Sequence, residues 1–142
     1  PRDHATRLIN AFLRRALQNQ PLEIHGGGQI FDFTYIDDTV AAIFAAADNL
    51  QTNHQSLSPI HILPGEPVQI EELAELIIEA TESDSEIVFT PGRDYDVEIF
   101  YGSPERMHRL LNVSCPTNIR EGIAQCLDLY LSEISMVEGG IS

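Results

Sequence analysis

At 142 residues the chain is long enough for one compact domain, and its 43% hydrophobic residues can supply an ordinary apolar core. Its formal net charge is −14, from 22 acidic and 8 basic residues. A surface this acidic repels the phosphate backbone, which argues against nucleic-acid binding. The sequence has neither a run of 18 apolar residues nor a charged-then-apolar start. That pattern argues against a membrane span or a secretion signal. A reducing cytoplasm is the default expectation for the location of the chain.

All eight basic residues are arginine, and lysine is absent, so chemistry that needs a lysine must obtain it from elsewhere. Cys115 and Cys126 form neither a disulfide framework nor a metal-binding pattern, and the five histidines show no ligand spacing. We therefore predict no metal site. The chain opens at Pro1 without an initiator methionine, which predicts a processed or truncated piece of a longer protein.

The first third of the chain alternates helix, strand and turn patterns. Apolar residues at helical spacing predict an amphipathic helix over Asp3–Gln18, with Asp3 as its N-cap. Leu22–Ile24 alternates like a half-buried strand. Gly26–Gly28 then breaks the backbone, and the β-branched and aromatic residues of Ile30–Ile36 predict a second strand.

The middle of the chain continues this alternation. The short polar side chains of Asp37–Thr39 precede a helical pattern over Val40–Leu50, so one of them is expected to be its N-cap. Apolar residues predict a short strand at Ile60–Leu63 and another at Glu86–Phe89. Between these strands, one apolar face predicts a helix over Glu71–Thr81.

The last third reads as two helices. Ser103-Pro104-Glu105 is a typical helix opening, and Asn118 with Glu121 has the spacing of a capping box for the final helix. We expect residues 1–135 to form the domain and 136–142 a frayed tail. Short strands among about five helices predict a mixed α/β fold with a small mixed sheet.

Two features could carry chemistry but have simpler explanations. A dinucleotide-binding loop needs a helix after its glycines, whereas a strand pattern follows Gly26–Gly28, so we interpret the triplet as a turn. Asp32, Asp37 and Asp38 could suggest a divalent-metal site, but strand-end polarity and helix capping account for them.

A family resemblance runs along nearly the whole chain. LEIHGGGQIFDFTYIDDTVAA resembles the "xxVxGDGxQxRDFTYVDDxVxA" block of NAD-dependent nucleotide-sugar epimerases and dehydratases, the extended short-chain dehydrogenase/reductases. IHILPGEPVQIEELAEL is similar to the "YNIGxxxPVxxxELAxxI" junction of that family. The resemblance implies that the chain is the carboxyl-terminal part of an extended Rossmann-type fold, most like UDP-glucuronate and UDP-glucose 4-epimerases.

The resemblance also implies a substrate site. PGRDYDV is similar to the family's "PxRxGDV" loop, which makes Arg93 the clamp on the diphosphate and Asp96 the acceptor for ribose hydroxyls. Ile24 and His25 match the strand whose backbone lies against the base, and the His25 ring would stack on it. The alternative for Arg93 is a surface Arg–Asp pair of little energetic value. For His25 the alternative is an exposed, inert side chain.

One position departs from the family. Phe31 stands where members usually carry an arginine that contacts phosphate, and the glycine loop before it is one residue shorter. The ligand is then held by Arg93 alone, or the ligand differs, or binding has been lost. Ser103 likewise occupies a position that is usually aspartate.

These observations leave three hypotheses. The first is the substrate-binding part of an NAD-dependent nucleotide-sugar epimerase or dehydratase, inactive alone because the Rossmann half, with NAD and a Tyr-x-x-x-Lys pair, is missing. The second is a non-catalytic nucleotide-sugar-binding or assembly module, and the third an unrelated acidic α/β domain. For the isolated piece we also expect self-association, because apolar surface normally covered by the missing half would be exposed.

Overall fold

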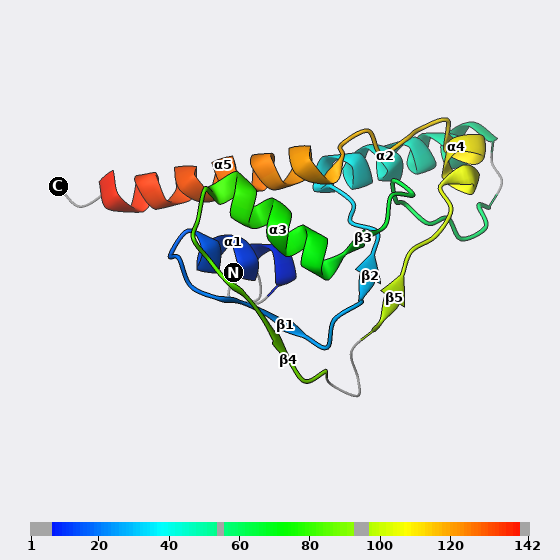
Figure 1. The fold of residues 1–142 in the computed structure, drawn as a ribbon. Helices are drawn as coiled ribbons and strands as arrows, with labels where there is room; N and C mark the ends of the chain where they lie inside the picture. Colours follow the sequence, from blue (N-terminus) through cyan, green and yellow to red (C-terminus); the bar gives the residue numbers. More distant parts are fainter. Residues whose placement is uncertain (1–6, 54–55, 93–96, 140–142) are drawn as a thin grey trace. The chain divides into compact units, whose positions relative to one another are not determined.

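The computed structural model of the protein describes residues 7–53, 56–92 and 97–139. Within these ranges five helices and five short strands interleave, which confirms the predicted mixed α/β class (Figure 1). In chain order the elements are α1 (Leu8–Ala16), β1 (Leu22–His25), β2 (Ile30–Phe31), α2 (Ile36–Asn53), β3 (Val68–Gln69), α3 (Ile70–Thr81), β4 (Ile87–Thr90), β5 (Ile99–Phe100), α4 (Glu105–Leu111) and α5 (Ile119–Gly139).

The chain divides into two compact units, each assembled from separated segments. The first unit comprises Pro1–Gly28, Ile70–Asp96 and Arg120–Ser142, and the second comprises Gln29–Gln69 and Val97–Ile119. The strands form two small sheets, one in each unit. β1 pairs with β4 in the first unit, and the second unit has the strand order β3-β2-β5.

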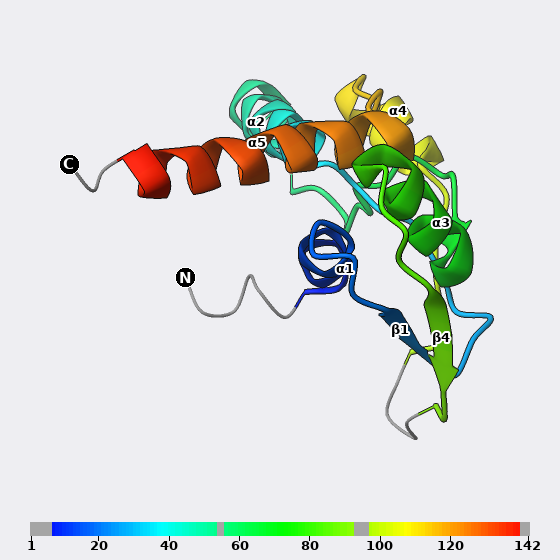
Figure 2. The same cartoon turned by 60° about the vertical axis from the view of Figure 1, so that its left-hand side comes forward.

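The first unit packs two helices against a pair of parallel strands. The apolar stripe of α1 buries Phe12, Leu13 and Ala16, and that of α3 buries Leu73 and Ile77. α1 contacts α3, and both contact β1. Figures 1 and 2 show β1 and β4 running side by side away from these helices. The strands therefore present their carboxyl-terminal ends together.

The connection from α1 to β1 is held by Arg15. Its guanidinium donates to the carbonyl of Pro21 at 2.7 Å and to the carboxylate of Glu23 at 2.9 Å. The hydrogen bond and the positive charge of Arg15 lower the pKa of Glu23. This pair is exposed to solvent, so it fixes local geometry more than it stabilises the fold.

α3 ends in a Schellman motif whose left-handed position is occupied by glutamate. The Ser83 N–H donates to the Ile78 carbonyl at 3.2 Å, and the Glu82 N–H donates to the Glu79 carbonyl at 3.2 Å. Glu82 has a φ of 51°, a conformation that glycine adopts without steric cost and other residues do not.

We therefore expect Glu82→Gly to raise the free energy of unfolding by about 1 kcal/mol, measured by urea denaturation. Glu75, an exposed residue in the interior of the same helix, supplies the matched control. Glu75→Gly should lower the free energy of unfolding by about 1 kcal/mol, since glycine is a poor helix former there. A loss of stability in Glu82→Gly would contradict the left-handed assignment.

The second unit combines the mixed sheet with a helix pair. β2 pairs antiparallel with β3 and parallel with β5. α2 packs against α4, and the fully buried Ala42 and Met107 meet in their core. The opposite side of α2 leaves Ile36, Val40 and Phe44 exposed, a stripe at helical spacing without cover in the described unit.

Several sequence predictions for the second unit are wrong. β2 ends at Phe31 rather than continuing to Ile36, and α2 begins at Ile36, so Asp37–Thr39 lies inside the first turn and supplies no N-cap. Ile60–Leu63 forms no strand. A strand requires a neighbouring strand that hydrogen-bonds to its peptide groups. The Ile62 carbonyl instead accepts a hydrogen bond from the hydroxyl of Thr34 at 3.2 Å. The two-residue strands β3 and β5 were not predicted.

The predicted openings of the two last helices are confirmed in position. The Ser103 hydroxyl accepts the Glu105 N–H at 3.2 Å at the start of α4, and α5 begins directly after Asn118. α5 includes residues 136–139, which the sequence assigned to the tail, and residues 140–142 lie outside the described ranges. So does Asp3, the predicted N-cap of the first helix.

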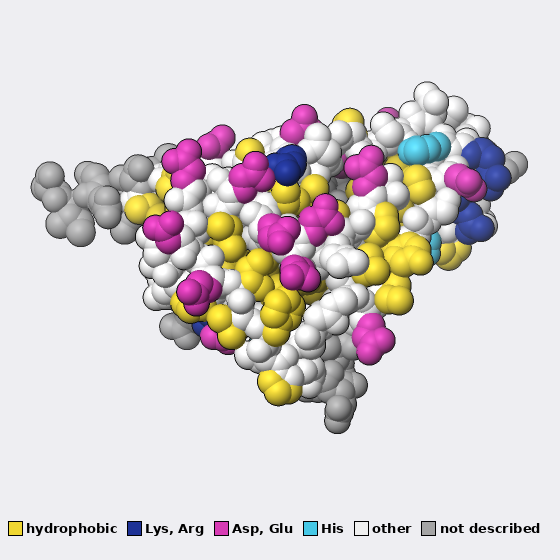
Figure 3. Space-filling model, viewed as in Figure 1, with side chains coloured by type: hydrophobic (Ala, Val, Ile, Leu, Met, Phe, Trp, Pro, Cys, Tyr) yellow, Lys and Arg dark blue, Asp and Glu magenta, His cyan; other side chains and the backbone are white. Residues whose placement is uncertain are grey.

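The surface seen in Figure 3 carries acidic side chains scattered among hydrophobic ones, and few arginines. Among the helices of the described ranges, none has the length and hydropathy that a membrane span requires.

Candidate functional site

The ends of β1 and β4 are the part of the first unit where predicted site residues converge. The two strands pair in parallel, with Ile24 opposite Phe89 and His25 opposite Thr90. Ladder pairing extends one step further, because the Gly26 N–H donates to the Thr90 carbonyl at 2.8 Å. Both strands therefore finish at the same level, and the loops that follow them begin side by side.

The two strand-end residues are also joined through their side chains. The Thr90 hydroxyl oxygen lies 2.6 Å from Nδ1 of His25, and 3.4 Å from the Ile24 carbonyl oxygen. Both side chains are half-buried, so the His25 ring is neither loose nor fully enclosed. Ile24 is buried in the core, with 2% of the residue exposed, and its predicted contact with a base stays a prediction.

The glycine triplet is a tight turn, as predicted. Gly26, Gly27 and Gly28 all have positive φ, and β2 follows them instead of a helix. A Cβ on Gly27 would lie 3.5 Å from the Phe89 ring, and one on Gly92 would lie 3.3 Å from the Gly26 Cα. The loop after β1 thus contacts the start of the loop after β4.

Arg93 and Asp96, the predicted phosphate clamp and ribose acceptor, lie outside the described residues. Pro91 and Gly92 alone separate Arg93 from Thr90 at the end of β4. The loop that carries both residues therefore starts beside His25 and the glycine turn, and their roles stay predictions.

Phe31, the remaining predicted site residue, belongs to the second unit, whereas Ile24 and His25 belong to the first. It is half-buried at the end of β2, and its ring is 6.1 Å from that of Phe33, tilted by 50°. This is ordinary aromatic packing, and it gives the Phe31 position an apolar contact where the family usually has a cation.

Two carboxylates of the second unit have structural partners that the sequence did not reveal. Asp32 accepts the Gly65 N–H at 3.1 Å, and burial raises the pKa of its carboxyl despite this hydrogen bond and one from the backbone of Glu66. Asp38, only 7% exposed, accepts both the backbone N–H of Thr117 at 3.1 Å and its hydroxyl at 3.2 Å.

These contacts give the aspartates roles in positioning loops. The described residues contain no group of three His, Cys, Asp or Glu side chains arranged to hold a metal ion. The partners of Asp38 lie 79 positions away in sequence, so no local pattern could indicate them.

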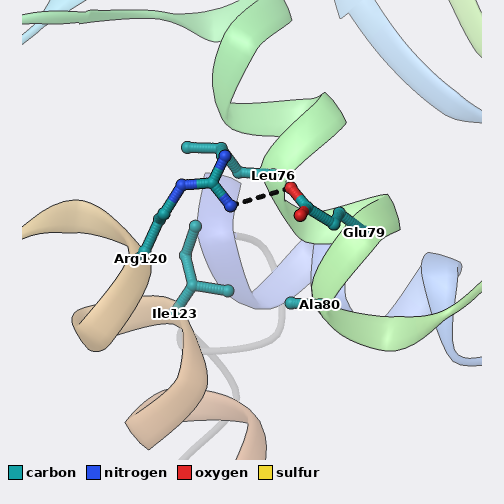
Figure 4. Close-up of a pocket in the computed structure, with 5 residues that line it drawn as sticks. All are labelled: Leu76, Glu79, Ala80, Arg120 and Ile123. Atoms are coloured by element: carbon teal, nitrogen blue, oxygen red, sulfur yellow. Dashed lines mark hydrogen bonds and ion pairs between the residues drawn. The ribbon is translucent and has the colours of Figure 1, made fainter.

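A shallow pocket of about 260 Å³ lies elsewhere in the first unit, between α3 and α5 (Figure 4). Arg120 and Glu79 are its charged lining groups, and their side chains form an ion pair at 2.8 Å. Leu76, Ala80 and Ile123 supply the apolar walls. Because the guanidinium is already neutralised by a carboxylate, this pocket is a poor site for an anionic ligand.

Residues 1–58 of the chain match the family described as the NAD dependent epimerase/dehydratase family. Among solved structures, epimerase Mth375 from Methanothermobacter thermautotrophicus matches with a TM-score of 0.82 and 26% identity, over 94% of this chain and 40% of its own. WbmF from Bordetella bronchiseptica, solved with NAD+ and UDP, matches with a TM-score of 0.72 and 26% identity, over 94% of this chain and 38% of its own.

A UDP-glucose 4-epimerase from Thermotoga maritima, solved with UDP-glucose, matches with a TM-score of 0.81 over 90% of this chain. At 22% identity this likeness shows the fold alone. The chain spans about 40% of the length of the solved structures that it matches. The resemblance found in the sequence is thereby confirmed: the chain matches the NAD-dependent epimerase/dehydratase family over residues 1–58 and has the fold of about 40% of two solved epimerases.

Proposed function

We propose that this chain is the nucleotide-sugar-binding portion of an NAD-dependent epimerase or dehydratase, and that its ligand is a UDP-sugar. The observation that carries the proposal is the parallel pairing of β1 with β4. That pairing starts the loop leading to Arg93 beside His25 and the glycine turn, which supports a site at this edge with His25 at the base and Arg93 at the diphosphate. The solved WbmF complex with UDP supports this ligand class.

Electrostatics explains why binding of a diphosphate would depend on the loop that contains Arg93. A nucleoside diphosphate is an anion, and a chain of net charge −14 cannot attract it through its overall field. A local guanidinium is required, because its planar fork forms charge-assisted hydrogen bonds to phosphate oxygens. We assign this role to Arg93 and the ribose hydroxyls to Asp96.

The chain's own residues do not fit the cofactor. NAD supplies hydride exchange with the sugar carbon when bound, and its pyrophosphate needs a glycine loop that opens a helix. The glycine turn of this chain leads into β2 instead. Together with the absence of lysine, this assigns NAD and the Tyr/Lys pair to a further portion of the polypeptide, and this chain alone should not turn over substrate.

Calorimetric titration of the protein with UDP, UMP and uridine tests the assignment. We expect affinity to fall in that order, since each phosphate removed takes charge-assisted hydrogen bonds with it. Equal affinity for UDP and uridine would exclude a phosphate clamp, and undetectable binding of all three would contradict a nucleotide site.

A second candidate function is a non-catalytic nucleotide-sugar-binding or assembly module. The packing of Phe31 against Phe33 favours it, because an apolar side chain there cannot contact phosphate. The coding sequence upstream of residue 1 separates the candidates. A glycine fingerprint and a Tyr-x-x-x-Lys pair encoded there would support the epimerase or dehydratase, and their absence would favour this second function.

A further inference from the structure

α2 has two apolar sides, and only one of them is covered in the second unit. Ala42 is fully buried against α4, and Ala45 and Ala46 pack on the same core. The other side exposes six apolar side chains, which we call the α2 stripe: Ile36, Val40, Ile43, Phe44, Ala47 and Leu50. Phe44, near the middle of the helix, is 68% exposed. A contiguous apolar band of this kind marks an interaction site.

Polar contacts prevent α2 from turning this stripe inward. Asp38 accepts two hydrogen bonds from Thr117, and the Asn49 side chain donates to the Leu110 carbonyl at 2.9 Å. Asp38 and Asn49 lie about three helical turns apart, on the side of α2 away from the stripe. Together they fix the rotation of α2 about its axis, so the stripe stays outside the core of the second unit.

The spacing of the stripe indicates the shape of its partner. Its members follow the i, i+4, i+7, i+8, i+11 pattern of a helix that packs on a core, which is broader than the a/d seam of a coiled coil. The NAD-binding portion that we assign to a further part of the polypeptide requires a Rossmann fold, which is built on a parallel sheet. Helices cover both faces of such a sheet, and its strands are apolar on both sides. The α2 stripe is complementary to a sheet face of this kind.

Charge distinguishes this partner from a second copy of the chain. Asp37 and Asp48 border the stripe and are exposed, and α2 contains no basic residue. Two copies, each of net charge −14, would bring acidic surfaces together. This chain covers 40% of each of two solved epimerases, so the larger part of those proteins is available for such an interface.

We propose that the α2 stripe is the surface by which this chain docks on the NAD-binding portion of the same polypeptide, with α2 covering part of one face of its parallel sheet. The proposal rests on the proposed function, which assigns NAD to that further portion. It goes beyond that function by naming the surface that joins the two portions.

Thiol labelling measures the cover directly. Cys115→Ser and Cys126→Ala remove the native thiols, and Phe44→Cys is then introduced both into residues 1–142 and into the complete product of the gene. Phe44→Cys should react about tenfold more slowly in the complete product, because buried thiols are inert. Arg109→Cys, at an exposed position of α4 in the same unit, should react equally in both proteins. Both are labelled at a concentration where sedimentation shows monomers.

Each outcome of the labelling decides the proposal. Equal reactivity of Phe44→Cys in the two proteins would overturn it, and so would a gene that encodes no further portion. Slow reaction in residues 1–142 alone would show that the first unit covers the stripe, and would also overturn it. If the complete product reacts slowly there but binds no UDP, the docking surface stands and the proposed ligand falls. Fast reaction in a complete product that binds UDP removes the docking surface and leaves the proposed function.

A stability comparison needs no introduced cysteine. Phe44→Ser should leave the midpoint of urea denaturation of residues 1–142 unchanged, because the side chain is exposed there, and should lower the midpoint of the complete product. Arg109→Ser should change neither midpoint. An equal effect of Phe44→Ser in both proteins would contradict the docking role of the stripe.

Discussion

Replacing Asp38 with alanine should lower the free energy of unfolding by about 3 kcal/mol. The nearly buried carboxylate accepts two hydrogen bonds from Thr117, and its loss leaves a backbone N–H and a hydroxyl without their partner. Hydrogen bonds to a charged group contribute more to the free energy of unfolding than neutral ones do. A buried donor left without an acceptor adds the cost of its desolvation. Urea denaturation measures the change.

Two variants separate this contact from the general effect of acidic residues at a helix start. Asp38→Asn keeps one acceptor oxygen and should lose about half as much stability. Asp37→Ala removes an exposed carboxylate from the same first turn and should cost less than about 1 kcal/mol. If Asp38→Ala were no more destabilising than Asp37→Ala, the anchoring role of Asp38 would be wrong.

Arg93→Ala should weaken UDP binding by about 1.5–3 kcal/mol, which corresponds to a loss of roughly tenfold to 150-fold in affinity. The reason is the charge balance: a chain of net charge −14 needs a local guanidinium to hold a diphosphate, and we assign that role to Arg93. Uridine should bind to the variant as well as to wild type, because it carries no phosphate. Calorimetric titration with both ligands measures the difference.

Arg14 provides the control for net charge. It is an exposed arginine on α1 in the same unit, so Arg14→Ala changes the overall charge equally without touching the strand ends. Its UDP affinity should equal that of wild type. Arg93→Lys should recover only part of the affinity, since a lysine lacks the bidentate fork. Wild-type affinity in Arg93→Ala would remove Arg93 from the site.

The sequence predicted those elements whose burial has a regular period. α1 and α3 each carry an apolar stripe that the core requires, and Leu13 and Ile77 lie where helical spacing places them. β1 could be predicted equally well, because the alternation of its apolar and polar residues reflects one buried face. The turn at Gly26–Gly28 followed from the backbone conformation that glycine alone adopts easily.

The failures occurred where tertiary contacts override local pattern. Two-residue strands such as β5 have no period to detect. Ile60–Leu63 has a strand composition, but strand pairing depends on neighbours that no local window includes. For Ile30–Ile36 the β-branched and aromatic residues indicated a long strand, whereas α2 starts at Ile36 and Asp38 faces Thr117.

The residues of the candidate site show the same distinction between local sequence pattern and tertiary contact. The family pattern pointed to His25 and Arg93 from residues adjacent in sequence, and the pairing of β1 with β4 brings the start of the Arg93 loop to His25. Thr90 was not found, since its significance arises from a hydrogen bond across two strands. Knowledge that β1 pairs with β4 would have indicated Thr90, because it is a polar residue at the end of a strand and in register with His25.

The first unit draws on three distant stretches of the chain, which affects how the polypeptide acquires its structure. The pairing of β1 with β4 must close a large loop before it gains any stabilisation, and such non-local pairing slows folding. Segments of the second unit lie wholly between those of the first, so during translation they can associate before α5 is made. Chaperone contact at that stage would fall on the apolar side chains of α3 that line the pocket with α5, Leu76 and Ala80.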